Sequence, residues 1–226
     1  MHVKLQSITP NIEETIVEIA RVSSTRKNKT EKPEGLINYL IKNKHWSPFE
    51  HGTITMEIDT TKAIGIQLLR HRSFTFQELS QRYAVVGASE PIELRQQATN
   101  NRQSSEDVIS LVHPEMGEFF LNEDFNHTPQ HDDLSQKVLD HIKAGQNLYG
   151  ELLEADVARE CARMILPMST STKIYMTGTV RSWVHMIDIR DDSHAQKEAQ
   201  EIAKEMKSIF IKELPLISNA LEWVKN

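Results

Sequence analysis

The residues best suited to chemistry lie close together in the stretch RHRSFTFQELSQRY, which occupies residues 70–83. It contains three arginines together with His71, Glu78 and Ser80. Guanidinium groups bind phosphates through bidentate, charge-assisted hydrogen bonds, and a nearby hydroxyl or carboxylate could recognise a sugar or the edge of a base. The stretch therefore predicts a binding site for an anion with a polar, hydrogen-bonding body.

A second group of arginines follows later in the chain: Arg159, Arg163, Arg181 and Arg190. Arg159 and Arg163 are spaced i,i+4, as are Arg181 and His185, so each pair would share one face of a helix. The alternative role is surface ion pairing, with Glu154, Asp188 or Asp191 as partners. Apolar neighbours of Arg163 and Arg181 argue against it, because a buried arginine is costly unless it is paired.

A zinc site is the obvious alternative, because five histidines lie near these clusters: His45, His51, His71, His185 and His194. However, the chain has no HExxH or CxxC pattern, and its lone cysteine cannot build a thiolate site. We therefore predict no metal. His71 lies between Arg70 and Arg72, so we expect it to be neutral, because nearby positive charge disfavours protonation.

Nucleophilic catalysis by Cys161 or Ser80 is not favoured. Cys161 would lie about 200° around a helix from Arg159 and Arg163, which predicts a small apolar residue facing the core. Ser80 lacks the glycines of a nucleophile elbow. Neither GxGxxG nor GxxxxGK[ST] occurs in the sequence, so a dinucleotide would have to be held by side chains and scattered backbone groups.

The bulk composition excludes several classes of protein. The 226 residues carry a net charge of −6, which disfavours general binding to nucleic acid. No apolar run approaches the roughly 20 residues of a membrane-spanning helix, and residues 1–6 do not resemble a signal peptide. The single cysteine rules out an intrachain disulfide and fits a reducing cytoplasm. We expect a cytoplasmic protein without a membrane span.

The elements that must position these residues follow from periodicity, proline and glycine. Helices are expected at residues 12–22, 33–44, 61–69, 133–163, 180–189 and 193–214, with a short last helix from Pro215. Strands are expected at residues 53–58 and 172–179, and a loop at residues 45–52. Ser193 is the expected cap of its helix. One α+β domain, residues 1–226, is the simplest organisation.

Periodicity fades in residues 95–131, which are polar and acidic, and this predicts a long loop. We expect residues of about 106–132 to decorate the surface, since only Gly117 could serve as a hinge. The following helix is expected to bury one stripe of side chains: Leu134, Val138, Ile142, Leu148, Leu152 and Leu153.

Several motifs together resemble the flavin-dependent thymidylate synthase family. Arg70, His71 and Arg72, followed after seven residues by Ser80, fit its RHRx7S signature. HWSPFEH at residues 45–51 resembles its H-x-[ST]-P-F-E-H segment, and ARMILP at 162–167 its A-R-x-x-L-P segment. Arg181, Arg190 and SHAQ at 193–196 resemble its R-S…L-R…S-H-A-Q segment. The similarity extends from about residue 21 to 198 in the family's order.

The resemblance implies a fold, an assembly and a reaction. The family's enzymes are homotetramers with active sites at subunit interfaces. The resemblance also implies a central twisted, mainly antiparallel sheet with long helices in each subunit. FAD is the implied cofactor, and NADPH and methylene-tetrahydrofolate are the implied co-substrates. NADPH reduces the flavin, the folate supplies a one-carbon unit to the uracil of dUMP, and reduced flavin delivers the hydride that completes the methyl group of dTMP.

The resemblance also assigns roles to individual residues. Arg190 would lie against the uracil and favour its ionised form, while Ser80 and His45 are the other implied catalytic residues, His45 near the folate and flavin. The implied dUMP contacts are Gln67, Arg70, Glu78, Ser80, Gln81, Arg82, Arg163 and Arg190. The implied FAD contacts are Ser23, Ser47, Glu50, Arg70, His71, Arg72, Glu78, Thr179, Arg181, His185 and His194.

Three features depart from the family pattern. Gln77 and Thr179 stand where asparagine is common, and a threonine offers one donor fewer than an amide. The segment of about 106–132 is longer and more acidic than its counterpart in a minimal member, and so forms an insertion. The alternative functions are a related flavoenzyme that hydroxymethylates or methylates another pyrimidine nucleotide, and a catalytically inactive nucleotide-binding protein. A nucleic-acid-binding module is disfavoured, because aromatic and basic residues do not interleave.

Overall fold

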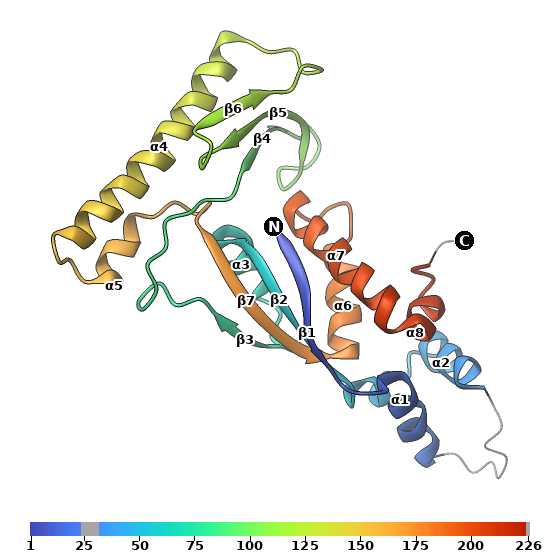
Figure 1. The fold of residues 1–226 in the computed structure, drawn as a ribbon. Coiled ribbons are helices and arrows are strands. Elements are labelled where there is room, and N and C mark those ends of the chain that lie inside the picture. Colours follow the sequence, from blue (N-terminus) through green and yellow to red (C-terminus); the bar gives the residue numbers. More distant parts are fainter. Residues whose placement is uncertain (24–31, 225–226) are drawn as a thin grey trace. The chain divides into compact units, whose positions relative to one another are not determined.

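The computed structural model describes residues 1–23 and 32–224 and confirms an α+β chain (Figure 1). The chain forms two compact units, each built from separate stretches. Unit 1 comprises Met1, Asp59–Arg70 and Glu78–Ile174, and unit 2 comprises His2–Ile58, His71–Gln77 and Tyr175–Asn226. Organisation as a single domain stays a prediction. The chain leaves unit 1 within the arginine-rich motif, between Arg70 and His71.

The larger sheet has the strand order β1-β2-β7-β3. Its strands are β1 (His2–Ile8), β2 (Thr53–Thr61), β7 (Ser171–Thr179) and β3 (Thr75–Glu78). β2 and β7 run antiparallel, because Thr55 hydrogen-bonds Thr177 at 2.9 Å while Tyr175 donates to Glu57 at 2.6 Å. Alternate side chains of both strands are buried, as expected for a sheet with one covered face. Both strands were predicted, whereas β1 and β3 were not.

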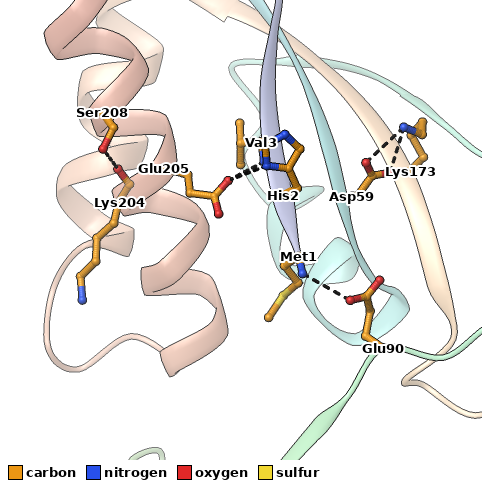
Figure 2. Close-up of polar contacts among 9 residues, drawn as sticks. All are labelled: Met1, His2, Val3, Asp59, Glu90, Lys173, Lys204, Glu205 and Ser208. Carbon is orange, nitrogen blue, oxygen red and sulfur yellow. Dashed lines mark hydrogen bonds and ion pairs between the residues drawn. The ribbon is translucent and has the colours of Figure 1, made fainter. Parts of the chain in front are cut away.

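Unit 2 contains five of the α-helices that the structure describes: α1 (Ile12–Ala20), α2 (Pro33–Lys42), α6 (Val180–Arg190), α7 (Lys197–Glu213) and α8 (Pro215–Ala220). Helix α7 packs on β1, α6 and α8, and α2 packs on α1 and α8. Ile37, Trp183 and Phe210 are fully buried. Figure 2 shows the Val3 amide donating to Glu205 on α7 at 2.6 Å, which ties β1 to this layer.

These helices match the predicted ones within a few residues, except at the start of α7. Gln196, not Ser193, occupies the cap position, and its side chain makes no capping hydrogen bond. The preceding residues are held in a separate turn, in which the Asp192 carboxylate accepts from the His194 amide at 2.8 Å. The polar residues Ser24 and Thr25, which follow this part of the chain, lie outside the described residues.

Unit 1 contains a second sheet where a long loop was predicted, so that prediction was wrong. β4 (Ile92–Gln97), β5 (Ser105–His113) and β6 (Glu118–Leu121) pair antiparallel in the order β4-β5-β6. Helix α4 (Pro129–Glu154) packs on β5 and β6 (Figure 1). Most strand side chains here are half-buried or exposed, so the sequence carries little of the apolar alternation that reveals a strand.

Helix α4 starts earlier and ends earlier than predicted. Thr128 and His131 form a capping box at its start, and the chain turns at Asp156, whose φ is 60°. The short helix α5 (Arg159–Ala162) is therefore a separate element. Of the predicted stripe, Ile142 is buried, but Leu134 and Leu148 are exposed.

Helix α3 (Lys62–Leu68) agrees with its prediction and is capped by the hydroxyl of Thr61, which accepts from the Ile64 amide at 3.3 Å. It ends two residues before Arg70, the first residue of the arginine-rich motif. Among the helices within residues 1–23 and 32–224, none combines the length and the apolar character needed to cross a bilayer.

Candidate functional site

A cavity of about 460 Å³ opens beside α6 in unit 2. This volume falls within the range typical of small-molecule sites, roughly 300–1,000 Å³. Arg181 and His185 both line the cavity, as their i,i+4 spacing predicts. The lining residues come from α6, from the HWSPFEH segment and from the arginine-rich motif: Trp46, Glu50, Ser73, Arg181, Ser182, Val184, His185 and Asp188.

Close packing against β7 brings the arginine-rich motif to this cavity. Phe74 is buried and meets the Trp183 ring edge to face, with the ring centroids 4.8 Å apart. A Cβ at Gly178 would overlap the ring of Phe74, so only glycine allows this approach. The Ser182 hydroxyl also donates to the Ser73 carbonyl at 3.4 Å. Phe74 therefore fixes Ser73 at the cavity wall.

Three polar side chains form a clamp, and two of them, Glu50 and Arg181, line the cavity. Glu50, in the 3-10 helix η2 (Ser47–Glu50), accepts from Arg181 Nη1 at 2.8 Å and from the Thr179 hydroxyl at 2.8 Å, one bond to each carboxylate oxygen. The Thr179 hydroxyl also accepts from the Ser182 amide at 3.3 Å and so caps α6. The partner of Arg181 is thus Glu50, not an acidic residue of its own helix.

His71 and Arg190 form a further polar contact within unit 2. Arg190 Nε donates to His71 Nε2 at 3.0 Å. Burial, followed by the positive charges of Arg190 and His185, lowers the pKa of His71 to about 4. The neutral state predicted for His71 is therefore confirmed, but its causes are burial and Arg190 rather than the adjacent arginines. Burial also lowers the pKa of Arg190 from its usual value.

The predicted site residues His45 and Ser47 line a smaller cavity of about 340 Å³. Apolar side chains of α1 and α2 also line it, as does His51. Tyr39 on α2 meets the His45 ring edge to face, with centroids 5.8 Å apart. The His45 amide donates to the Leu40 carbonyl at 2.8 Å, so the backbone of His45 is fixed while its side chain stays exposed.

The remaining residues that were predicted to bind the nucleotide belong to unit 1: Gln67, Arg70, Glu78, Ser80, Gln81, Arg82 and Arg163. Glu78 accepts from Lys62 Nζ at 2.7 Å and from the Thr172 hydroxyl at 2.9 Å, both on the same oxygen. Gln81 is 8% exposed, and its amide nitrogen has no hydrogen-bond partner among the described residues. A buried amide without a partner is expensive, so Gln81 is suited to receive an acceptor from a ligand.

The predicted residues thus fall into two groups, one in each unit. Glu50, His71, Thr179, Arg181, His185 and Arg190 belong to unit 2 with Ser47, Arg72 and His194. Arg72 and His194 are exposed, and His194 Nδ1 lies 2.7 Å from Asp192. Ser23 ends η1 (Arg21–Ser23), and its side chain lies outside the described part.

The burial predicted for Cys161 was wrong, because its side chain is exposed. Helix α5 is a single turn that buries Ala162, and both Arg159 and Cys161 are exposed on it, so the 200° spacing did not direct Cys161 to the core. Arg163 follows α5 and is half-buried.

Asp188 is the cavity residue that sequence reasoning assigned only to surface pairing. It lies three residues after His185 on α6, so the helical spacing could have revealed it. Partial burial raises the pKa of Asp188, against the influence of Lys207 and a hydrogen bond from Trp223. Lys62 and Thr172, which hold Glu78, carry no sequence signal. Within the described residues, no three His, Cys, Asp or Glu side chains gather into a metal-binding group.

Comparison with known proteins agrees with the motifs. A family model described as thymidylate synthase complementing protein matches residues 4–216. The chain is 41% identical to a probable flavin-dependent thymidylate synthase of Paramecium bursaria Chlorella virus 1, covering 99% of this chain and 100% of the relative. It is 40% identical to a flavin-dependent thymidylate synthase of Synechocystis sp., covering 90% and 86%, and 30% identical to one of Thermus thermophilus, covering 92% and 70%.

Proposed function

Because the chain belongs to the flavin-dependent thymidylate synthase family, we propose that the cavity beside α6 binds the flavin and that the Ser80 region binds the nucleotide. The enzyme converts dUMP to dTMP by reductive methylation, with methylene-tetrahydrofolate as the one-carbon donor and NADPH as the reductant of FAD. The bound flavin, once reduced, supplies the hydride that completes the methyl group.

The side chains of the larger cavity fit FAD. FAD has two phosphates, several hydroxyls and aromatic rings, so its site needs a cation, hydrogen-bonding groups and an apolar wall. Arg181 offers the cation, Glu50 and His185 offer hydrogen-bonding groups, and Trp46 offers an aromatic surface. The clamp of Glu50 and Thr179 restricts the guanidinium of Arg181 before the ligand arrives. The proposed FAD contacts are Ser23, Ser47, Glu50, Arg70, His71, Arg72, Glu78, Thr179, Arg181, His185 and His194.

Arg190 is the proposed activating residue. A guanidinium against the uracil stabilises negative charge on the ring and so activates it for attack on the one-carbon unit. The bond from Nε to His71 orients the guanidinium plane, and neutral His71 can accept that bond because its Nε2 keeps a lone pair. His45 is the proposed residue near the folate, and Ser80 the proposed hydroxyl at the nucleotide.

The proposed dUMP contacts are Gln67, Arg70, Glu78, Ser80, Gln81, Arg82, Arg163 and Arg190. Two of them carry structural support of their own. Gln81 presents a buried amide without a partner among the described residues. Arg82 is only loosely paired, with Nε 3.4 Å from Glu160 in an exposed pair. Exposed ion pairs contribute little to stability, so Arg82 can exchange this partner for a phosphate at small cost.

We further propose a homotetramer with active sites shared between subunits, located in the cytoplasm. Large apolar side chains of unit 1 are unusually exposed in the single chain, including Tyr83 at 79% and Met164 at 77%. Both adjoin proposed nucleotide contacts, Arg82 and Arg163. Exposed apolar clusters beside a binding site are typical of interfaces, and the single cysteine is consistent with a reducing compartment.

The clamp, whose Glu50 and Arg181 line a cavity of about 460 Å³, is the observation that carries the flavin assignment. Purified protein should be yellow, with flavin absorbance near one per chain, and tetrameric by light scattering. Incubation with dUMP, methylene-tetrahydrofolate and NADPH should yield dTMP by mass spectrometry. A colourless protein that does not take up added FAD would overturn the assignment. A hydroxymethylated product, or turnover of dCMP in place of dUMP, would indicate the related activity instead.

A further inference from the structure

The segment that follows the proposed nucleotide residues, residues 83–90, lacks helix and strand apart from one isolated bridge. It leads from Arg82 to β4 and carries exposed apolar side chains at Tyr83 and Val85. Fixing one backbone residue costs about 1–2 kcal/mol in conformational entropy. The Tyr83 and Ala84 amides donate to the Ser80 carbonyl at 3.1 and 3.0 Å, so the geometry of Ser80–Gln81–Arg82 depends in part on what holds this segment, which we call the 83–90 segment.

The far end of the 83–90 segment is held to the start of β7 by backbone bonds. Ser89 pairs with Thr170 in the isolated bridge, and the Ser171 amide donates to the Ala88 carbonyl at 2.9 Å. Ser89 is 2% exposed. Glu90 accepts from the Ser171 hydroxyl at 3.3 Å. It also accepts from the amino terminus of Met1 at 3.3 Å, a contact drawn in Figure 2.

Two side chains outside every family motif contact the same segment at Gly87 and Ser89. Glu115, in the turn between β5 and β6, accepts from the Ser89 amide at 3.0 Å. Gln146, in the middle of α4, donates from Nε2 to the Gly87 carbonyl and also lies 3.4 Å from both the Ser89 hydroxyl and Glu115 Oε1. The amide group has two hydrogens, so these three acceptors share them.

The turn and the helix that carry these residues are themselves fixed. Gly117 turns the chain with a φ of 75°, and its carbonyl accepts from Lys143 Nζ on α4 at 3.5 Å. Helix α4 packs on β5 and β6. Glu115 and Gln146 also contact each other, so the layer of β5, β6 and α4 meets the 83–90 segment through two linked side chains.

We propose that Glu115 and Gln146 are positioning residues for the nucleotide: they hold the 83–90 segment so that Ser80, Gln81 and Arg82 keep the arrangement that binds dUMP. This inference rests on the proposed nucleotide site. It gives residues 106–132 a role beyond surface decoration, because Glu115 belongs to that insertion. Neither residue touches substrate in this scheme, and both act through the backbone of Gly87 and Ser89.

The test compares Glu115→Ala and Gln146→Leu with two controls. Glu115→Gln keeps the oxygen that accepts from Ser89 and should behave as the wild type. Gln136→Leu changes the same residue type on α4, where Gln136 Nε2 donates to the exposed Asp140 at 2.8 Å, and should have no effect. We expect Glu115→Ala and Gln146→Leu to raise the KM and the Kd for dUMP about tenfold, which equals about 1.4 kcal/mol.

The same two variants should change kcat and FAD affinity by less than twofold, and hydrogen exchange of residues 83–90 should accelerate. Unchanged KM and Kd for dUMP would overturn the inference. Equal losses of FAD and dUMP affinity would also overturn it, because they would indicate a general effect on folding.

Arg82→Ala separates this inference from the site itself. If Arg82→Ala leaves dUMP binding unchanged, the proposed nucleotide site fails and the positioning role falls with it. If only Arg82→Ala weakens binding, the nucleotide site stands and the positioning role alone fails.

Discussion

Replacing Thr179 with valine should weaken FAD binding and destabilise α6 by separable amounts. The change keeps the shape of the side chain but removes a hydroxyl that donates to Glu50 at 2.8 Å and accepts from the Ser182 amide at 3.3 Å. Loss of a helix cap costs about 1 kcal/mol. The unfolding free energy of Thr179→Val should therefore fall by about that amount in urea denaturation of the FAD-free protein.

The effect on FAD follows from the second hydrogen bond. Hydrogen bonds to charged groups contribute about 1.5–3 kcal/mol, but the Glu50 side chain is 40% exposed, so water replaces part of this bond. We expect about 1 kcal/mol, which is roughly a fivefold increase in the Kd for FAD. Flavin fluorescence quenching measures this Kd, and the Glu50–Arg181 ion pair transmits the loss to the cavity.

Two further variants make the Thr179 experiment decisive. Thr179→Ser keeps both hydrogen bonds and should restore FAD affinity and stability. In a Glu50→Ala background, Thr179→Val should change FAD affinity by less than twofold, because the bond is already absent. If Thr179→Ser binds FAD as weakly as Thr179→Val, or if the two substitutions act additively, the hydroxyl does not act through Glu50 and the clamp has no role in flavin binding.

Three other predictions follow from buried or catalytic groups. Burial raises the pKa of Glu13, whose carboxylate accepts from the Ile217 amide at 2.8 Å. The stability that Glu13 contributes is therefore fully present below the pKa of the unfolded state. It is lost as the pH rises through the pKa of the folded state. Glu13→Gln should therefore make the unfolding free energy less dependent on pH above pH 4.5, as measured by urea denaturation; an unchanged profile would contradict this. The pKa of His71 is lowered to about 4 from an ordinary value of 6.5, so His71 acts in the opposite direction. The stability that it contributes is complete above pH 6.5 and is lost as the pH falls toward 4. His71→Gln should flatten that acid limb in the same assay, and an acid limb as steep as that of the wild type would refute it. Cys161→Ala should retain most of the dTMP-forming activity and Arg190→Ala should lose most of it in a product assay, whereas the reverse order would overturn the mechanism.

Much of the secondary structure could be predicted because strong signals are local. Helix α2 begins at Pro33 and α6 at the Thr179 cap, and both signals lie within a few residues of the helices they start. The sheet β4-β5-β6 could not be predicted, because its side chains are mostly half-exposed and the pairing of β4 with β5 shifts register near Arg95. Without a fully buried face, a strand leaves no alternation of apolar and polar residues.

The sequence by itself determined the family and the residue types proposed for its site, since motif order and residue type are properties of the chain alone. It also predicted the neutral state of His71, although for the wrong reason. Only the tertiary structure decided the partners: Glu50 holds Arg181 across 131 residues, and Arg190 holds His71 across 119. Hydrogen bonds depend on distances of about 3 Å. Packing of separate elements sets those distances, and the spacing of residues along the chain does not.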